Sequence, residues 1–229
     1  MKESIVAFRR RISVKTAGAF ARATTSVSSR HDLVRLGSAY GGWWIPTELV
    51  GADSIVYSAG VGEDVTFDLA LIDAFGCDVW ALDPTPRSIE FAKGIGDPQF
   101  HFLPVGIWSE DAELRFYAPT RSEHVSHSIL NIQHSDKFFI ARCLSLPSLM
   151  RELDHGRIDV LKMDIEGAEG PVLDAMLRQG INPRILCVEF DAVEAPWRFR
   201  SRLRRLARAG YVVRHIEDRN FTFTSERQQ

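Results

Sequence analysis

The chain has 229 residues, 45% of them hydrophobic and 25% charged, which is typical of a globular protein with one α/β domain and a lead-in segment. Its formal net charge of −2 excludes a global electrostatic attraction to nucleic acids or membranes, and we expect no nucleic-acid partner. The three cysteines are widely spaced and show no CxxC pattern, which argues against a disulfide framework or a zinc site and favours a reducing, cytoplasmic location.

The N-terminal segment, residues 1–50, is predicted to form a helical lead-in or cap. Its first 35 residues are rich in arginine and contain only two acidic residues, Glu3 and Asp32. Organelle transit peptides have a similar composition, but a basic surface helix that precedes the domain is the interpretation we favour. No apolar stretch of the chain approaches the roughly 20 residues of a transmembrane helix, so we predict no membrane span.

Residues 51–229 are predicted to form the main domain, because short apolar runs alternate there with segments of helical periodicity. The expected strands cover residues 54–58, 78–82, 100–105, 158–163 and 184–190, and the expected helices cover 64–76, 88–94, 148–153, 168–179 and 197–209. Such alternation predicts an α/β fold with a mainly parallel sheet and helices on both faces. The last two apolar runs, 211–216 and 220–224, are joined by a short polar turn and predict an antiparallel hairpin.

Two stretches of the main domain depart from this alternation. Residues 112–117 indicate an edge strand or one arm of a hairpin. Residues 119–140 are polar, rich in serine and histidine, and lack periodicity, so we predict a loop-like insertion that serves as a substrate lid. Together with the N-terminal segment, this insertion is expected to shape the acceptor pocket.

A glycine turn follows the first expected strand, in the stretch Ser58-Ala59-Gly60-Val61-Gly62. Glycines at this point let the chain turn sharply and let its backbone approach a ligand without interference from a Cβ atom. Asp83 lies 21 residues after Gly62, at the end of the second strand, where a carboxylate can accept both ribose hydroxyls of a nucleoside. Pro84 ends that strand and fixes its exit geometry. We therefore expect a nucleoside-containing cofactor here, with Ser58, Gly60, Val61, Gly62, Asp83 and Pro84 among its contacts.

The residues that follow the glycines indicate which cofactor it is. A dinucleotide fingerprint needs glycine at position 65, but the residue is Val65. Glu63 and Asp64 stand where a pyrophosphate would rest on the helix N-terminus, and two carboxylates repel phosphate. They are compatible with a cationic ligand, such as the amino group or sulfonium of S-adenosylmethionine, although they can also cap the helix. The pattern therefore favours S-adenosylmethionine over NAD.

Another apolar stretch with a glycine gap ends the third strand. Val105 and Gly106 are expected to form a shelf for the adenine ring. Trp108 fits equally well beside this shelf or in the core.

A group of acids follows the strand 158–163. Asp164 and Glu166 are two positions apart at the end of a strand, so both carboxylates are expected to face one pocket at the carboxyl edge of the sheet. Glu169 adds a third acid within six residues, which is costly unless the acids bind a cation, a hydroxyl or each other. A helix N-terminus could also stabilise Glu166 and Glu169. Lys162 is expected to pair with an acid or to complete a buried ion pair.

The stretches 56–64, 83–86 and 161–169 together resemble the FkbM-type methyltransferases, with further similarity at 41–46 and 188–190. The resemblance covers about residues 40–224, and its most specific part is Asp164-Ile165-Glu166-Gly167-Ala168-Glu169. It implies a Rossmann-like class I methyltransferase fold, with a mainly parallel seven-stranded sheet and an antiparallel last strand. It also implies S-adenosylmethionine-dependent O-methylation of a small-molecule, polyketide or sugar hydroxyl. Ser58 departs from the acidic residue that many methyltransferases have there, so the cofactor amino group is expected at Glu63, Asp64 or Asp164.

Catalysis of such a transfer needs a base that removes the hydroxyl proton, and a positioned base contributes typically ~10²–10⁴-fold. The candidates are Asp164, Glu166 and His127, the last of which lies in the polar insertion. A divalent metal would suit the acids near the strand ends, but no ligand spacing is specific enough to predict one. The alternatives are an NAD-dependent oxidoreductase on a similar sheet and a non-catalytic cofactor-binding module.

Overall fold

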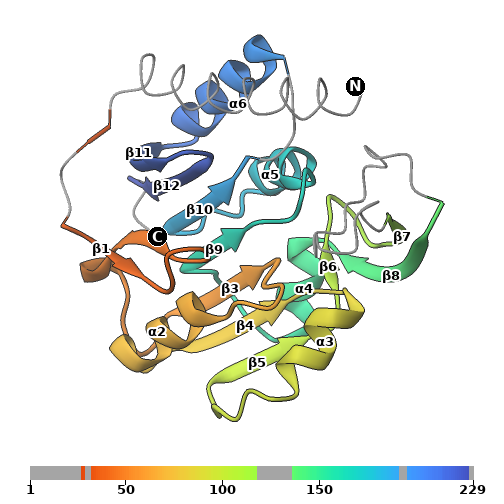
Figure 1. Ribbon diagram of the computed structural model, residues 1–229. Coiled ribbons are helices and arrows are strands. Elements are labelled where there is room, and N and C mark those ends of the chain that lie inside the picture. The colour runs from red at the N-terminus through yellow and green to blue at the C-terminus, as the bar shows by residue number, and fades with distance from the viewer. Residues whose placement is uncertain (1–26, 29–31, 118–135, 191–194, 227–229) are drawn as a thin grey trace, which may run out of the picture.

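The computed structural model describes all residues except 1–26, 29–31, 118–135, 191–194 and 227–229. A seven-stranded sheet in the order β11-β12-β10-β9-β3-β4-β5 forms its centre (Figure 1). Its strands are β3 (Ile55–Ala59), β4 (Asp78–Leu82), β5 (Phe100–Leu103), β9 (Val160–Met163), β10 (Ile185–Glu189), β11 (Tyr211–Glu217) and β12 (Asn220–Ser225). Neighbouring strands from β10 to β5 are parallel, whereas β12 is antiparallel to both β10 and β11. The predicted sheet with an antiparallel last strand is confirmed.

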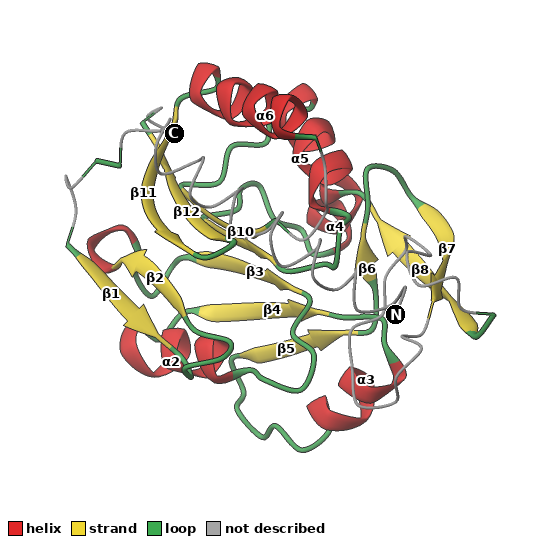
Figure 2. Ribbon diagram, turned by 45° about the horizontal axis from the view of Figure 1, so that its top comes forward, coloured by secondary structure: helices red, strands yellow, loops and turns green. Residues whose placement is uncertain are grey.

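Helices cover both faces of this sheet, as predicted (Figure 2). They are α2 (Thr66–Phe75), α3 (Pro86–Ala92), α4 (Leu146–Glu152), α5 (Glu169–Arg178) and α6 (Pro196–Arg208). Successive residues of a strand point to opposite faces, so Tyr57 packs in a cluster with residues of α4, α5 and α6, and Val56 in a cluster with residues of α2 and α3. Because both faces of the inner strands are buried, these strands are continuous apolar runs.

The described part of the N-terminal segment is a strand pair and not the expected helix. β1 (Leu33–Leu36) and β2 (Trp43–Pro46) pair in antiparallel fashion, and a 3-10 helix, η1 (Thr47–Leu49), follows. Trp43 and Ile45 are buried on either side of the half-buried Trp44 and pack into the α2 side of the core. Thr222 of β12 donates a hydrogen bond of 2.6 Å to the carbonyl of Trp44. These tertiary contacts stabilise extended chain where the overall composition suggested a helix.

A second, three-stranded sheet lies in the order β6-β8-β7, next to α3 and α4 (Figure 2). It contains β6 (Gly106–Ile107), β7 (Ala112–Tyr117) and β8 (Phe138–Leu144), and the expectation of a hairpin arm at 112–117 is confirmed. The predicted insertion 119–140 is too long at its end, because residues 138–140 belong to β8. Phe138 and Ile140 are apolar but exposed. This part of β8 therefore lacks the alternation of buried apolar and exposed polar residues by which a strand is recognised in a sequence. The rest of the predicted lid, up to residue 135, lies outside the described residues.

Candidate active site

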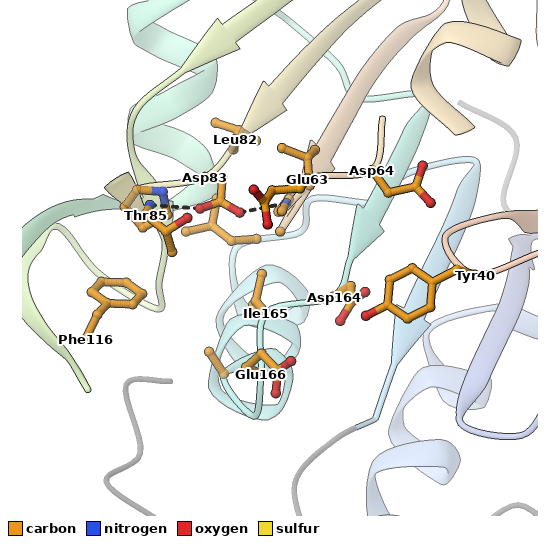
Figure 3. Close-up of a pocket in the computed structure, with 18 of the residues that line it drawn as sticks. Tyr40, Glu63, Asp64, Leu82, Asp83, Thr85, Phe116, Asp164, Ile165 and Glu166 are labelled. Atoms are coloured by element: carbon orange, nitrogen blue, oxygen red, sulfur yellow. Dashed lines mark hydrogen bonds between the residues drawn. The ribbon is translucent and has the colours of Figure 1, made fainter. Parts of the chain in front are cut away.

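A cavity of about 530 Å³ opens at the carboxyl ends of β3, β4 and β9 (Figure 3). This edge of a parallel sheet, where neighbouring strands lead into helices on opposite faces, is the usual ligand site of doubly wound folds. The volume lies in the range of cavities that hold a small molecule or cofactor, about 300–1,000 Å³. Each of these strand ends contributes side chains to the cavity.

The end of β3 contributes the glycine turn. Gly60 has a φ of +76°, and a Cβ atom there would lie 1.7 Å from the carbonyl oxygen of Asp164, so no other residue fits this position. Gly62 has a φ of +56°, but a Cβ atom there would meet nothing within 4 Å. Both glycines and Val61 line the cavity, as predicted. Gly60 is therefore needed for the close approach of β9, whereas Gly62 leaves space on the cavity side.

The end of β4 contributes Asp83, which is only 5% exposed. One carboxylate oxygen accepts a hydrogen bond of 3.0 Å from the N–H of Gly62, and the other accepts one of 2.8 Å from the N–H of Thr85. Each carboxylate oxygen has two lone pairs, so both oxygens keep the capacity to accept another hydrogen bond from a ligand. Asp83 and Pro84, two of the expected cofactor contacts, both line the cavity, and dashed lines in Figure 3 mark the hydrogen bonds of the Asp83 carboxylate.

The end of β9 contributes Asp164 and Glu166, which line the cavity opposite Asp83 (Figure 3). The two acids converge through a turn and not through strand alternation, because β9 ends at Met163 and Glu166 has a φ of +53°. A glutamate in this left-handed region is uncommon, and such backbone strain concentrates at functional sites. The structure thus brings both predicted acids to one pocket by a different local geometry.

Glu169 holds this turn and does not line the cavity. It is 1% exposed, and its carboxylate accepts hydrogen bonds of 3.3 Å from the N–H of Ile165 and 3.0 Å from the N–H of Gly167. Burial raises the pKa of Glu169 to about 7, in spite of these hydrogen bonds. Glu169 is therefore the structural acid of the three, since it fixes the backbone on both sides of Glu166.

Two further residues next to these acids were not predicted as site residues. Glu189 ends β10 and pairs with Arg219 at 2.6 Å; burial and then the charge of Asp164 raise its pKa. Tyr40, from the β1–β2 loop, lines the cavity, and burial and then Asp164 raise the pKa of its hydroxyl. Figure 3 shows the Tyr40 ring directed toward Asp164. Glu189 is one of the acids near the strand ends that would suit a divalent metal, although no metal was predicted, whereas nothing near Tyr40 indicates that it lies close to a residue 124 positions away along the chain.

The turn before α2 contributes Glu63 and Asp64 to the lining. Burial raises the pKa of Asp64, but hydrogen bonds from Ser38 and Thr66 outweigh it and hold the pKa below its ordinary value. Glu63 lies 4.0 Å from Arg87, and both side chains are about half exposed. Five carboxylates, those of Glu63, Asp64, Asp83, Asp164 and Glu166, line the cavity, and no lysine, arginine or histidine does so among the described residues. The cavity therefore favours a neutral or cationic ligand.

The apolar end of the cavity differs from the expected shelf. Gly106 lines it as predicted, together with Ile107 and Phe116, and a Cβ atom on Gly106 would lie 2.8 Å from the Cys143 sulfur. Val105 is buried in the core cluster and does not line the cavity, so its predicted contact with the cofactor is corrected. Trp108 packs against the same cluster, which decides in favour of its core interpretation.

Of two other predicted site residues, one lies outside the cavity and the other lies outside the described residues. Ser58 is completely buried and does not line the cavity, since its side chain points to the α2 face, and Ala59 lines the cavity instead. Its expected contact with the cofactor is corrected accordingly. His127 lies outside the described residues and stays a prediction.

Within the part of the chain that the structure describes, no cluster of three or more histidines, cysteines and acids is arranged to hold a metal ion. Within the same residues, no helix is long and apolar enough to cross a membrane.

Comparison with known proteins identifies the family. Residues 51–213, more than half of the chain, match the family model of the methyltransferase FkbM domain. The chain belongs to the FkbM methyltransferase family. The three solved chains that match include the fibrillarin pre-rRNA processing protein of Methanococcus jannaschii, with 9% sequence identity and a TM-score of 0.46 over 87% of this chain and 84% of that one. No curated protein matches the chain.

Proposed function

We propose that this methyltransferase uses S-adenosylmethionine as its methyl donor and methylates a hydroxyl group of a small molecule or glycan. The observation that carries the proposal is the position of the Asp83 carboxylate. Hydrogen bonds from the Gly62 and Thr85 amides hold it next to the glycine turn, within a cavity lined by acids. This arrangement suits a ligand that has both a ribose and a positive charge.

The residues present fit S-adenosylmethionine better than a dinucleotide. Asp83 would accept the ribose hydroxyls, and the apolar end at Ile107 and Phe116 would hold the adenine ring. Asp64 or Asp164 would bind the amino group. A pyrophosphate would meet carboxylates and no cation among the described lining residues, which is unfavourable in a partly buried cavity.

The bound cofactor supplies an electrophilic methyl group on a sulfonium. The acids at the end of β9 supply the base, since Asp164 and Glu166 line the cavity and Glu189 lies next to Asp164. Burial and the charge of Asp164 raise the pKa of Glu189, so Glu189 holds a proton more readily than an isolated glutamate does. Asp164 or Glu166, which line the cavity, would take up the proton of the acceptor hydroxyl. His127 stays a further candidate from the sequence.

The same lining limits the acceptor. A phosphorylated or carboxylated acceptor would meet Asp164 and Glu166 at close range, and like charges at close range repel strongly in a site that is shielded from water. A neutral hydroxyl compound is the chemical class that this lining accepts.

The proposal is tested by isothermal titration of the purified protein with S-adenosylhomocysteine and, separately, with NAD. We expect saturable one-to-one binding of S-adenosylhomocysteine and no measurable heat with NAD. Transfer of labelled methyl groups from S-adenosylmethionine to panels of neutral small hydroxyl compounds and glycans then defines the acceptor. Binding of NAD in place of S-adenosylhomocysteine would overturn the proposal.

A further inference from the structure

A lysine lies in the middle of the buried sheet, directly below the cavity. Lys162 belongs to β9, where it is 6% exposed and lies beside Ser58 of β3 and Cys187 of β10. Burial of an ammonium group is costly unless its hydrogen bonds and its charge are satisfied. The contacts of Lys162 therefore show what this side chain does.

The ammonium group of Lys162 donates hydrogen bonds to two carbonyls at the end of β3. It lies 2.6 Å from the carbonyl oxygen of Gly60 and 3.3 Å from that of Ala59. Ala59 also accepts a hydrogen bond of 3.1 Å from the N–H of Asp164, so the same peptide connects the turn to the catalytic acids. Lys162 thus holds the glycine turn from the side of β9.

A buried acid that interacts electrostatically with this lysine is Asp68, in the first turn of α2. Asp68 is 2% exposed, and burial raises its pKa to about 6, against the lowering effects of Lys162 and the Ser58 hydroxyl. Ser58 lies beside Lys162 in the sheet, on the strand whose neighbouring residue Val56 packs with α2. The charge of Lys162 is therefore accompanied by a buried carboxyl group of α2.

The turn is held from two directions. Lys162 fixes the Gly60 carbonyl, and Asp83 fixes the Gly62 amide. Glycine has more backbone freedom than any other residue, so a turn with glycines at both of these positions needs such anchors to stay in one conformation. The backbone that faces the cavity lies between the two anchors.

We propose that Lys162 is a positioning residue for cofactor binding: its ammonium group, accompanied by the buried Asp68, holds the Gly60–Gly62 turn in the conformation that accepts the ligand. This inference rests on the proposed use of S-adenosylmethionine. We assign the effect on affinity to the hydrogen bonds with the carbonyls and not to the electrostatic interaction with Asp68. Removal of both charges together should therefore restore stability without restoring affinity.

The test compares the double variant Lys162→Met/Asp68→Asn, the single variant Asp68→Asn and the surface control Lys93→Met. Lys93 is an exposed lysine at the end of α3. Thermal unfolding measures stability, and isothermal titration measures the Kd of S-adenosylhomocysteine. We expect the double variant to unfold close to wild type but to bind about tenfold or more weakly, as for a lost hydrogen bond to a charged group. Asp68→Asn and Lys93→Met should bind within about threefold of wild type, since neither removes these hydrogen bonds.

Wild-type affinity in a folded double variant would overturn the inference, as would a loss in Asp68→Asn equal to that of the double variant. If variants without the lysine do not fold, Asp68→Asn alone decides: affinity near that of wild type supports the inference, and a tenfold loss contradicts it. A wild-type protein that binds no S-adenosylhomocysteine would overturn the proposed function, and the inference with it. The two failures are therefore distinguishable.

Discussion

Asp83 has two tasks, because the same carboxylate orders the backbone and faces the ligand. It accepts hydrogen bonds from the backbone N–H groups of Gly62 and Thr85, and it lines the cavity. Asp83→Asn replaces one acceptor oxygen by a donor and removes the charge, so it should weaken S-adenosylhomocysteine binding by about tenfold to a hundredfold. Isothermal titration measures the change.

Asp97→Asn is a matched control for this substitution. Asp97 also accepts a hydrogen bond from the backbone N–H two residues further along the chain, that of Gln99, at 2.9 Å, but it does not line the cavity. The Asp97→Asn variant should bind S-adenosylhomocysteine as wild type does. Equal affinity of the Asp83 and Asp97 variants would show that Asp83 does not contact the cofactor.

At this scale, residues that follow a strand end could be predicted and residues that depend on side-chain direction could not. Asp83, Asp164 and Glu166 follow apolar runs, and the carboxyl ends of parallel strands meet at one edge. Ser58 belongs to the correct strand but points to its other face, which the run Ile55-Val56-Tyr57 does not reveal because both faces are buried. Tyr40 reaches the site only through the tertiary position of the β1–β2 loop.

The glycine turn shows how one element serves both the fold and the ligand. Gly60→Ala would place a Cβ atom 1.7 Å from the Asp164 carbonyl, so it should destabilise the fold by at least about 3 kcal/mol. Gly62→Ala meets no atom within 4 Å, so it should fold with the cost of a left-handed alanine, roughly 1–2 kcal/mol. Its methyl group would occupy ligand space and weaken S-adenosylhomocysteine binding by about tenfold, or ~1.4 kcal/mol.

Gly76→Ala separates these two effects. Gly76 ends α2 with a φ of +66° and open space around its Cβ position, but it lies outside the cavity lining. Thermal unfolding should show a similar loss of stability in Gly62→Ala and Gly76→Ala. Isothermal titration should show weaker S-adenosylhomocysteine binding in Gly62→Ala alone. Normal binding by Gly62→Ala would place the ligand away from the turn.

Most helices and strands of the main domain could be predicted, because their apolar residues recur regularly over many positions and a glycine or proline marks one of their ends. Gly76 marks the end of α2, and Pro196 marks the start of α6. The β1–β2 pair could not be predicted. Each strand has only four residues, and the burial of Trp43 and Ile45 depends on α2 and the central sheet, which are distant in the sequence.

Over the whole molecule, buried acids determine how stability varies with pH. Burial raises the pKa of Glu169 from 4.5 to about 7 and that of Asp68 from 3.8 to about 6, and it also raises the pKa of Glu189. The folded protein therefore binds protons more tightly than the unfolded chain, so these groups stabilise the fold fully below about pH 4 and lose that contribution as the pH rises to about 8. Asp64 has a lowered pKa and acts in the opposite direction, at lower pH.

Glu169→Gln tests this account, because glutamine keeps an acceptor oxygen for the Ile165 and Gly167 amides but cannot ionise. The free energy of unfolding of wild type should fall between about pH 4.5 and 7. In the variant this fall should be smaller by up to about 3 kcal/mol. Urea unfolding at several pH values measures it.

Glu90→Gln is the control, since the Glu90 side chain is 76% exposed. It should follow the wild-type pH dependence. An unchanged slope in Glu169→Gln would show that Glu169 does not hold a proton in the folded state.

The architecture as a whole could be predicted because strands and helices alternate, which implies a parallel sheet covered on both faces. The order of the strands is not contained in that alternation. The pattern predicted the antiparallel hairpin at the end of the chain, and only the family resemblance placed it in a seven-stranded, mainly parallel sheet. The three-stranded sheet was missed in part, since Phe138 and Ile140 are exposed and the pairing of β8 with β6 and β7 is a tertiary property.

We expect the cavity between the Gly60–Gly62 turn and Asp83 to bind S-adenosylmethionine. A crystal structure of the protein with S-adenosylhomocysteine tests this directly. The ribose hydroxyls should lie within hydrogen-bond distance of the Asp83 carboxylate, and the adenine should lie beside Ile107 and Phe116. A nucleoside bound elsewhere, or one that makes no contact with Asp83, would contradict it.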